Sequence, residues 1–284
     1  MKKNIIILGS NGSIGIILKH FFKDSFNIYS FDIPGFDVLN KNHISFFLRK
    51  LDKTKKYTIV NCIGLMGADS SKENVEKYIE INSFFPSEFI ENIIEKILIE
   101  KYIFLSSETI YGFGKNLLEN DKKNPIHPYG ISKLIAEINI KKIFGKIRKK
   151  IPIIILRIPV VIFHKQKFDN TLTLICNDFK KRKVTIFGNG THERNYIFIK
   201  DFCEIISLIV IKKMSKLIHV FNVPGNRCSS INIVKILQKK YQKKINIDFK
   251  KSNKSFSLVS SSKKFNKIFK FKLKYNLKKI IELL

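Results

Sequence analysis

The sequence predicts an α/β protein built on a Rossmann-type, doubly wound parallel sheet with a smaller C-terminal domain. Apolar runs of strand length alternate with longer stretches of helical spacing through residues 4–158. These runs are apolar throughout, which is typical of strands buried on both faces. A glycine-rich turn, GSNGSIG at residues 9–15, joins the first run to a helical pattern. Such alternation indicates parallel strands whose carboxyl ends carry the ligand site.

The predicted elements follow one another along the chain. Apolar runs predict strands at residues 4–8, 27–31, 58–64, 101–107 and 151–158. Apolar residues at helical spacing predict helices around 14–23, 42–51, 75–98 and 129–146, and NLKKIIELL predicts an amphipathic last helix. We therefore expect a dinucleotide-binding domain over 1–165. Residues 166–284 are expected to form a mainly substrate-binding domain, with some segments packing back on the first.

The charge of the chain raises the question of its partners. Lys and Arg number 53 against 23 acidic residues, a net charge of +30, and such charge suggests nucleic acid or an anionic membrane surface. The basic residues fall in separate short runs, at 141–150, 180–183 and 239–244, and no RNA-binding motif accompanies them. We predict solvated faces and no specific nucleic-acid partner.

The apolar stretches and the cysteines indicate in which cellular compartment the protein is expected. The longest apolar stretch, residues 151–163, contains Arg157 and two prolines and is too short to span a bilayer. The cysteines are far apart, without the spacing of a metal site. We expect a cytoplasmic protein with reduced thiols, no membrane span and no bound metal.

The glycine-rich turn has two interpretations. It could be a tight turn and nothing more, because glycine and asparagine adopt positive φ at low cost. It could also hold a pyrophosphate, with Gly9 making the turn, Gly12 allowing close approach and Gly15 letting the helix pack on the strand. The strand before it and the helix after it favour the second. Asn11, Ser13 and Ile14 would then belong to the same cofactor site.

Two aspartates follow the second predicted strand. Asp32 lies 23 residues after Gly9, where a carboxylate accepts hydrogen bonds from an adenosine ribose and repels a 2′-phosphate, so NAD is favoured over NADP. The alternative for Asp32 is an exposed turn beside Pro34. Asp37 could contact the adenine amino group or cap a helix beginning near residue 41, and the sequence leaves both open.

HPYGISKLIAE indicates an acid/base pair. Tyr129 and Lys133 are four residues apart at the start of a predicted helix, so their side chains share a face. A tyrosine pKa near ~10 is too high for a base at neutral pH, but a lysine ammonium and an oxidised nicotinamide nearby would favour the phenolate. In FLSSETIYG the fourth strand ends at Ser107, whose hydroxyl could hold a substrate oxygen beside Tyr129.

Taken in order, these motifs resemble the extended short-chain dehydrogenases of the nucleotide-sugar epimerase/dehydratase type. The resemblance runs through NCIG, EINSFFP, LRIPVV and GNGTHERNYIFIKDF to the tail. It implies that Ser107, Tyr129 and Lys133 are catalytic, that Lys133 also binds the nicotinamide ribose, and that NAD is held by the glycine loop and Asp32. It further implies cofactor contacts for Asp37, Asn82 and Pro159, and substrate contacts for Ser107, Glu108 and Arg194. Arg194, expected at a nucleotide diphosphate, could instead form only a surface ion pair with Glu193.

The chain also departs from this family's pattern. Val160 replaces an asparagine that touches the diphosphate in many members, and Phe163 replaces a nearby glycine. Glu108 precedes Thr109 where dehydratases have an Asp-Glu pair, which disfavours dehydration because water loss needs both an acid and a base. We therefore expect NAD(P)-dependent epimerisation of a nucleotide sugar at C4 by a homodimer. A 4-keto-sugar reductase is the alternative, and a non-catalytic dinucleotide-binding or RNA-binding member of the fold a further one.

Overall fold

The main sheet of the protein is parallel and six-stranded. The computed structural model describes residues 2–40, 42–66, 75–164, 170–252 and 256–284. The strand order of the main sheet is β10-β6-β4-β3-β1-β2, so the predicted doubly wound sheet is confirmed. The strands are β1 (Asn4–Leu8), β2 (Asn27–Phe31), β3 (Lys56–Asn61), β4 (Leu98–Ser107), β6 (Ile153–Ile158) and β10 (Ile218–Asn222).

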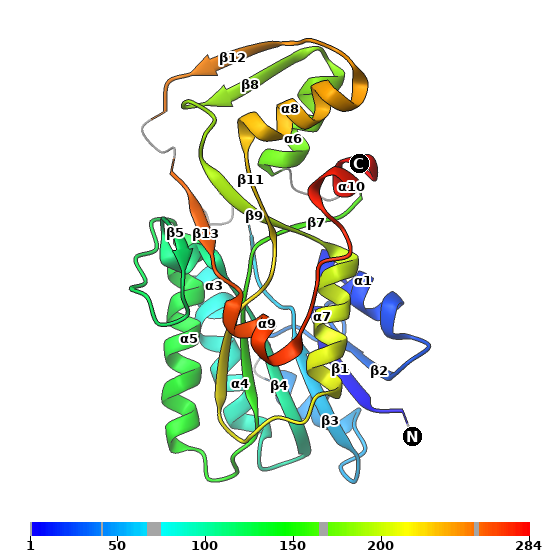
Figure 1. Cartoon of the computed structure of the whole chain (residues 1–284). Coiled ribbons are helices and arrows are strands. Elements are labelled where there is room, and N and C mark those ends of the chain that lie inside the picture. Colours follow the sequence, from blue (N-terminus) through cyan, green and yellow to red (C-terminus); the bar gives the residue numbers. More distant parts are fainter. Residues whose placement is uncertain (1, 41, 67–74, 165–169, 253–255) are drawn as a thin grey trace.

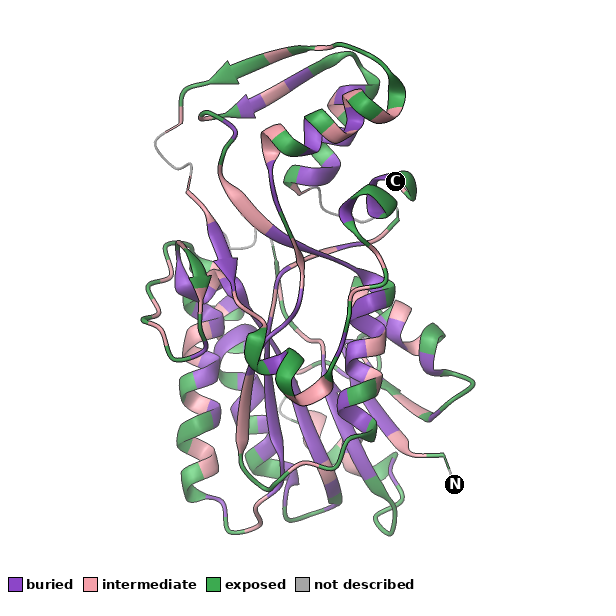
Figure 2. Ribbon diagram, in the orientation of Figure 1, coloured by how far each residue is buried: buried purple, intermediate pink, exposed green. Residues whose placement is uncertain are grey.

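Helices cover both faces of this sheet (Figure 1). Side chains alternate across a strand, so Ile5 and Ile7 of β1 pack with helices α1 (Ser13–Phe22) and α7 (Ile199–Ile211) on one face. Ile6 and Leu8 point to the other face. That face is covered by α2 (His43–Arg49), α4 (Phe85–Ile93) and α5 (Pro128–Lys146). Figure 2 shows the resulting buried layer along the strands.

The sheet reverses its winding between β1 and β3. The chain leaves β1 for β2 on one side, whereas β3, β4, β6 and β10 follow on the other. In open α/β sheets a ligand binds at this switch point, outside the carboxyl ends of the strands. The turn after Leu8 and the loop after Asn61 therefore border the expected site.

The helix predicted over 75–98 is interrupted. Helix α3 (Val75–Ile79) passes through a π-helical turn (Glu80–Phe84) into α4, and β4 begins at Leu98. Pro86 lies in the first turn of α4, where a proline is tolerated because the backbone N–H there has no helical partner. Short π turns are frequent at functional sites, and this one contains Asn82.

Most of the remaining elements form a smaller region above the carboxyl edge of the main sheet, whereas helix α9 (Lys263–Phe269) packs beside β10 (Figure 1). Strands β11-β9-β13-β5 make a second sheet, with β7 also paired to β9, and β8 and β12 form a separate pair. The domain boundary predicted at residues 165 and 166 lies outside the described residues. The elements are a 3-10 turn η3 (Glu108–Tyr111), β5 (Gly114–Leu117), β7 (Val160–Ile162), α6 (Thr171–Lys180), β8 (Lys183–Phe187), β9 (Glu193–Phe198), β11 (Asn226–Ser229), α8 (Ser230–Tyr241), β12 (Asn246–Lys250), β13 (Leu258–Ser260), α9 (Lys263–Phe269) and α10 (Leu277–Glu282).

Helices of the described ranges are all too short or too polar to cross a bilayer.

Candidate active site

The glycine loop is shaped by close backbone contacts. Gly9 has φ +74°, and its N–H donates to the Phe31 carbonyl at 2.9 Å, which ties the turn to β2. A Cβ added to Gly15 would lie 2.0 Å from the Gly9 carbonyl oxygen, so helix α1 can sit on this turn only with glycine there. Gly12 is the N-cap residue of α1 and is exposed. The free N–H groups of a helix N-terminus attract phosphate, so the loop fits a dinucleotide pyrophosphate.

Asp32 joins this loop to the end of β2. Its Oδ2 accepts the Asn11 N–H at 2.7 Å and its Oδ1 accepts the Ile33 N–H at 2.8 Å. The Asp32 side chain is half-buried beside the loop, which is the position that a ribose contact requires. Each of its carboxylate oxygens can accept a further hydrogen bond.

Asp37 lies farther out, in an exposed turn. Its Oδ1 accepts the Leu39 N–H at 3.0 Å. Helix α2 begins at His43 and its N-cap residue is Asn42. The alternative that Asp37 caps this helix is therefore wrong, and its adenine contact stays a prediction.

Ser107, Tyr129 and Lys133 converge at the carboxyl end of β4. The Ser107 Oγ accepts the Thr109 N–H at 3.2 Å and the Thr109 hydroxyl at 2.9 Å. The Tyr129 phenol lies near enough to Ser107 for the serine to lower its pKa. The Lys133 Nζ lies 5.9 Å from the centroid of the Tyr129 ring. A Cβ added to Gly64 would lie 3.0 Å from the same Nζ. The structure thus brings the three predicted catalytic side chains together with the loop after β3.

Burial sets the acidity of this group. It raises the pKa of Tyr129, Tyr78 adds to the rise, and the nearby Ser107 opposes it. Burial also lowers the pKa of Lys133 to about 8, although Cys62 acts in the opposite direction. Both shifts favour the uncharged forms. Within the chain itself the phenol is less acidic than a free tyrosine, which is the opposite of the direction expected from Lys133 alone.

Asn82 holds the edge of the site together. Its Oδ1 accepts the Leu65 N–H at 2.8 Å, and its Nδ2 donates to the Leu65 carbonyl at 3.0 Å and to the Ser132 hydroxyl at 3.3 Å. The π-helical turn therefore clamps the loop after β3 to α5, next to Lys133. Pro159 is buried after β6 and packs close to Gly225. The cofactor contacts expected of Asn82 and Pro159 stay predictions.

Glu108 follows Ser107 but turns toward the smaller region. Its carboxylate accepts hydrogen bonds from Asn195 Nδ2 at 2.8 Å and from the Ser260 hydroxyl. Burial raises its pKa to about 7, and these hydrogen bonds limit the rise. Glu108 thus links β4 to β9 and β13, and its predicted substrate contact stays a prediction.

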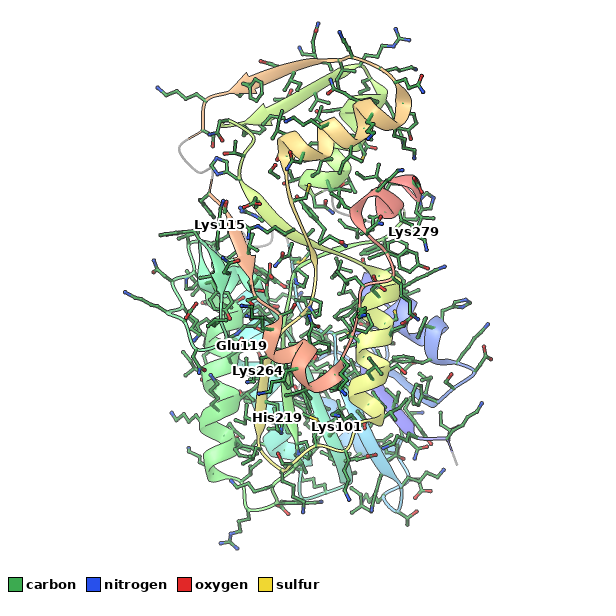
Figure 3. The ribbon with its side chains drawn as sticks, viewed as in Figure 1. Lys101, Lys115, Glu119, His219, Lys264 and Lys279 are labelled. Atoms are coloured by element: carbon green, nitrogen blue, oxygen red, sulfur yellow. The ribbon has the colours of Figure 1, made fainter. Side chains whose placement is uncertain are left out.

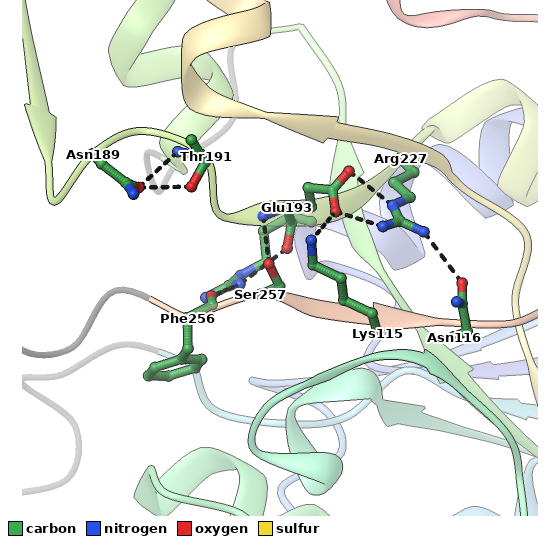
Figure 4. Close-up of polar contacts among 9 residues, drawn as sticks. Lys115, Asn116, Asn189, Thr191, Glu193, Arg227, Phe256 and Ser257 are labelled. Atoms are coloured by element: carbon green, nitrogen blue, oxygen red, sulfur yellow. Dashed lines mark hydrogen bonds and ion pairs between the residues drawn. The ribbon is translucent and has the colours of Figure 1, made fainter.

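Arg194 lies on β9 at the same junction. Its Nη1 donates to the carbonyls of Glu193, at 3.1 Å, and Phe256. The Glu193 carboxylate instead pairs with Arg227 at 2.6 Å and Lys115 at 2.8 Å (Figure 4). The alternative of a surface ion pair between Arg194 and Glu193 is therefore wrong. The guanidinium is 5.2 Å from the Phe256 ring, and its contact with a nucleotide diphosphate stays a prediction.

A buried ion pair between Arg157 and Glu137 also borders the site, and sequence reasoning did not assign it there. Arg157 of β6 donates to both carboxylate oxygens of Glu137, at 3.0 and 2.7 Å, and both side chains are almost fully buried. The Ser106 hydroxyl donates to the same carboxylate at 2.7 Å. Glu137 follows Lys133 by one helical turn on α5, so the pair anchors the helix of Tyr129 and Lys133 to β6. The Ser106 hydrogen bond ties the same helix to β4, the strand that carries Ser107. An acid four residues after Lys133 and an arginine inside an apolar strand were its signals.

This network extends toward β10. Arg157 Nη1 donates to the Tyr111 hydroxyl at 2.7 Å and to the Glu119 carbonyl at 2.8 Å. Tyr111 donates in turn to Asn222 Oδ1 at 2.7 Å, and the Asn222 N–H reaches the Glu119 carboxylate at 2.9 Å. Figure 3 labels Glu119 within this packed region. Among the described residues, no buried side-chain nitrogen or oxygen of this network lacks a hydrogen-bond partner, as a buried network requires.

The sequence matches one family model and several known proteins. A family model described as the NAD dependent epimerase/dehydratase family matches residues 5–223. YtcB of Bacillus subtilis (strain 168), described as an uncharacterized UDP-glucose epimerase, is 30% identical over 146 residues, which are 49% of this chain and 44% of that protein. The undecaprenol-linked N-acetylglucosaminyl 4-epimerase of Escherichia coli O157:H7 is 26% identical over 220 residues, covering 72% and 62%.

The first curated relatives are matched over less than half of their length. Among solved structures, a UDP-glucuronic acid 4-epimerase from Bacillus cereus, in complex with UDP-glucuronic acid and NAD, superimposes with a TM-score of 0.83. The two chains share 21% identity, over 99% of this chain and 97% of the other. This likeness extends the shared fold over the whole chain.

Proposed function

The chain belongs to the NAD dependent epimerase/dehydratase family, and on that premise we propose that it is an NAD-dependent epimerase of a nucleotide-activated sugar. The observation that carries the proposal is the meeting of Ser107, Tyr129 and Lys133 beside a glycine loop that a side chain at residue 15 would block. The names of the relatives support the reaction class, and the NAD complex of the B. cereus enzyme supports the cofactor.

The glycine loop and Asp32 would hold the two phosphates and the adenosine ribose of NAD. Asp32 disfavours a 2′-phosphate by charge repulsion, so NADP is the weaker candidate. Bound NAD would supply the hydride acceptor at the sugar carbon, which we place at C4. Lys133, whose Nζ lies beside the loop after β3, would bind the nicotinamide ribose.

The chain's own chemistry is proton transfer. Tyr129 would take the proton of the sugar hydroxyl that is oxidised and return it when the carbonyl is reduced. The Ser107 hydroxyl would hold the same sugar oxygen, while hydrogen bonds from Thr109 keep Ser107 in place. Because the phenol alone is less acidic than usual, the ammonium of Lys133 and the positive charge brought by the oxidised cofactor must favour its ionisation. Epimerisation requires the keto sugar to turn before it is reduced on its other face.

The proposal is tested by the state of the cofactor. Gel filtration of the purified protein should recover stoichiometric NAD, because an epimerase uses and regenerates one bound cofactor. Incubation with UDP-sugars and dTDP-sugars should then give C4 epimers without net change in absorbance of NADH. Protein that emerges without NAD and consumes NADH only with a 4-keto sugar would instead identify the reductase. Salt-resistant RNA binding that NAD leaves unchanged would identify a non-catalytic member of the fold.

We also propose a homodimer in the cytoplasm. The outer face of α5 exposes Ile131 and Ile138, at 44% and 54% of their surface, and apolar side chains on one helix face suit a second copy of the chain. The four cysteines are free thiols, which supports a reducing compartment. Light scattering of the parent and of an Ile138→Glu variant tests the dimer, which the charge should dissociate.

A further inference from the structure

The end of the molecule farthest from the main sheet carries an unusual density of positive charge. We define the basic tip as residues 178–187 and 239–251, which include the end of α6, β8, the end of α8 and β12 (Figure 1). It contains nine lysines, one arginine and two aspartates. None of the six ion pairs found among the described residues lies in it. Its basic side chains therefore form no ion pair with a described carboxylate side chain, and one of them, Lys180, donates from Nζ to the Leu284 backbone oxygen at 3.3 Å.

A pocket opens in this tip. It has a volume of about 490 Å³ and is lined by Lys180, Arg182, Lys243 and Lys244 together with the rings of Phe179 and Tyr241. No carboxylate lines it. The four cations are exposed, and Phe179 and Tyr241 pack 5.7 Å apart as its apolar wall. A pocket of this composition suits a phosphate group attached to an apolar body.

The strand pair beside the pocket has an uncovered face. In the register of β8 with β12, Val184 aligns with Ile247 and Lys183 with Asn246. Val184 is buried, whereas Lys183 and Asn246 are exposed, so only one face of the pair packs on the helices behind it. Figure 2 shows exposed residues along most of β12.

We propose that the basic tip docks the protein on an anionic phospholipid membrane, with a lipid phosphate in the pocket. Each lysine near an anionic bilayer surface strengthens binding about fivefold, and amphipathic aromatic rings favour the headgroup region. The tip offers both, since the amphipathic Tyr241 exposes 45% of its surface among the lysines, and Phe249, at 52%, adds an apolar ring that suits a membrane interface. Nucleic acid is less well matched, because arginine is the preferred residue for its recognition and the tip holds one arginine.

Docking through the basic tip would leave the proposed catalytic site uncovered. The pocket residues come from α6, α8 and the turns that follow them, whereas Ser107, Tyr129 and Lys133 lie at the main sheet. The docking surface is therefore independent of the proposed reaction, and its test does not use enzyme activity.

Vesicle flotation of the full chain tests the proposal at about 0.1 M salt. Vesicles of phosphatidylcholine containing phosphatidylglycerol should carry the protein, whereas pure phosphatidylcholine should not. Changing Lys180, Arg182, Lys243 and Lys244 to Gln should weaken partitioning by about 100-fold or more. The matched control changes Lys23, Lys53, Lys142 and Arg148 to Gln, which are exposed residues outside the tip with the same total charge, and it should shift partitioning by less than about threefold.

A second variant separates insertion from charge. Phe249→Ser removes an exposed ring and should weaken partitioning several-fold at unchanged net charge. Thermal melting confirms that each variant is folded. Failure of the parent to float with anionic vesicles would overturn the proposal. Equal losses in the two quadruple variants would also overturn it, because net charge and not the tip would then be responsible. RNA that displaces the protein from vesicles at equal phosphate concentration would assign the tip to nucleic acid.

Discussion

Two lysines are buried in the main sheet region, one toward each end of β4, and they are used differently. Lys101 lies toward the amino end (Figure 3), and its Nζ donates to the carbonyls of Ile209, Val210 and Lys212, where α7 ends. Lys133 lies toward the carboxyl end, and no described residue accepts a hydrogen bond from its Nζ. Burial lowers the pKa of both to about 8.

The comparison shows that a shifted pKa by itself does not mark a functional group. Lys101 has its donors satisfied by helix-end carbonyls, whose partial negative charge favours a cation. Lys133 retains unused donors beside Tyr129 and Gly64. A buried charge whose partners are complete stabilises the fold, and one whose partners are missing is available to a ligand. The following predictions test this distinction at the two ends of the sheet.

The largest effect is expected at the carboxyl end. Tyr129→Phe removes the phenol oxygen and keeps the ring, so turnover should fall by about 10²–10⁴-fold, the usual contribution of a positioned acid/base. Unfolding midpoint and NAD affinity should be retained, as measured by denaturation and by fluorescence titration. Ser107→Ala should lower turnover less. Activity of Tyr129→Phe within a few-fold of the parent would remove this residue from the mechanism.

The Arg157–Glu137 pair lies between the two ends and should affect both properties. Arg157→Met leaves a buried carboxylate without its partner and should lower the free energy of unfolding by about 3–5 kcal/mol. Combining it with Glu137→Leu removes both charges and should restore much of that loss. Turnover of the double variant should stay below the parent, because α5 and Ser106 lose their common anchor. Full recovery of kcat would restrict the pair to a structural role.

The two lysines themselves give the sharpest contrast. Lys101→Met should lower the free energy of unfolding by about 1–3 kcal/mol, because buried carbonyls lose their donor, and should leave kcat unchanged. Lys133→Met should leave stability unchanged or improved, while turnover and NAD affinity both fall. Denaturant unfolding and NAD titration of the two variants, measured side by side, are the test. The same pattern in both variants would refute the distinction drawn between them.

The smallest effect is expected on the pH dependence of stability, through Glu108, which links β4 to β9 and β13. Its pKa is about 7 in the fold against 4.5 in the free side chain, so the unfolded chain binds fewer protons between these values. The contribution of Glu108 to stability is complete below pH 4.5 and is lost as the pH rises to 7. Glu108→Gln should remove this decline, as chemical denaturation across that range would show.

Glu193 is the control of opposite sign. Arg227 and Lys115 hold its pKa at about 2, so its contribution to stability is present above pH 4.5 and is lost as the pH falls toward 2. Glu193→Gln should therefore cost stability at neutral pH, although by little because these side chains are partly exposed. An unchanged pH profile in Glu108→Gln would show that this carboxylate does not titrate with folding.

Much of the site could be predicted because local patterns determined it. The glycine spacing of GSNGSIG anticipated a position, Gly15, where a side chain would collide with the Gly9 carbonyl. The four-residue spacing of Tyr129 and Lys133 placed them on one helix face, as the structure has them. The π-helical turn at Asn82 escaped prediction, because apolar periodicity does not distinguish a π turn from continued helix.

What the sequence determined by itself was the order of the elements, the parallel sheet and the edge at which polar side chains gather. Burial of continuous apolar strands on two faces and short-range helical spacing suffice for these. Only the tertiary structure decided how each charge is used. Glu108 turns to Asn195 and Ser260, Glu193 pairs with Arg227, and Lys101 meets the end of α7. These partners are distant along the chain, and a charge takes its role from its partners and burial in the fold.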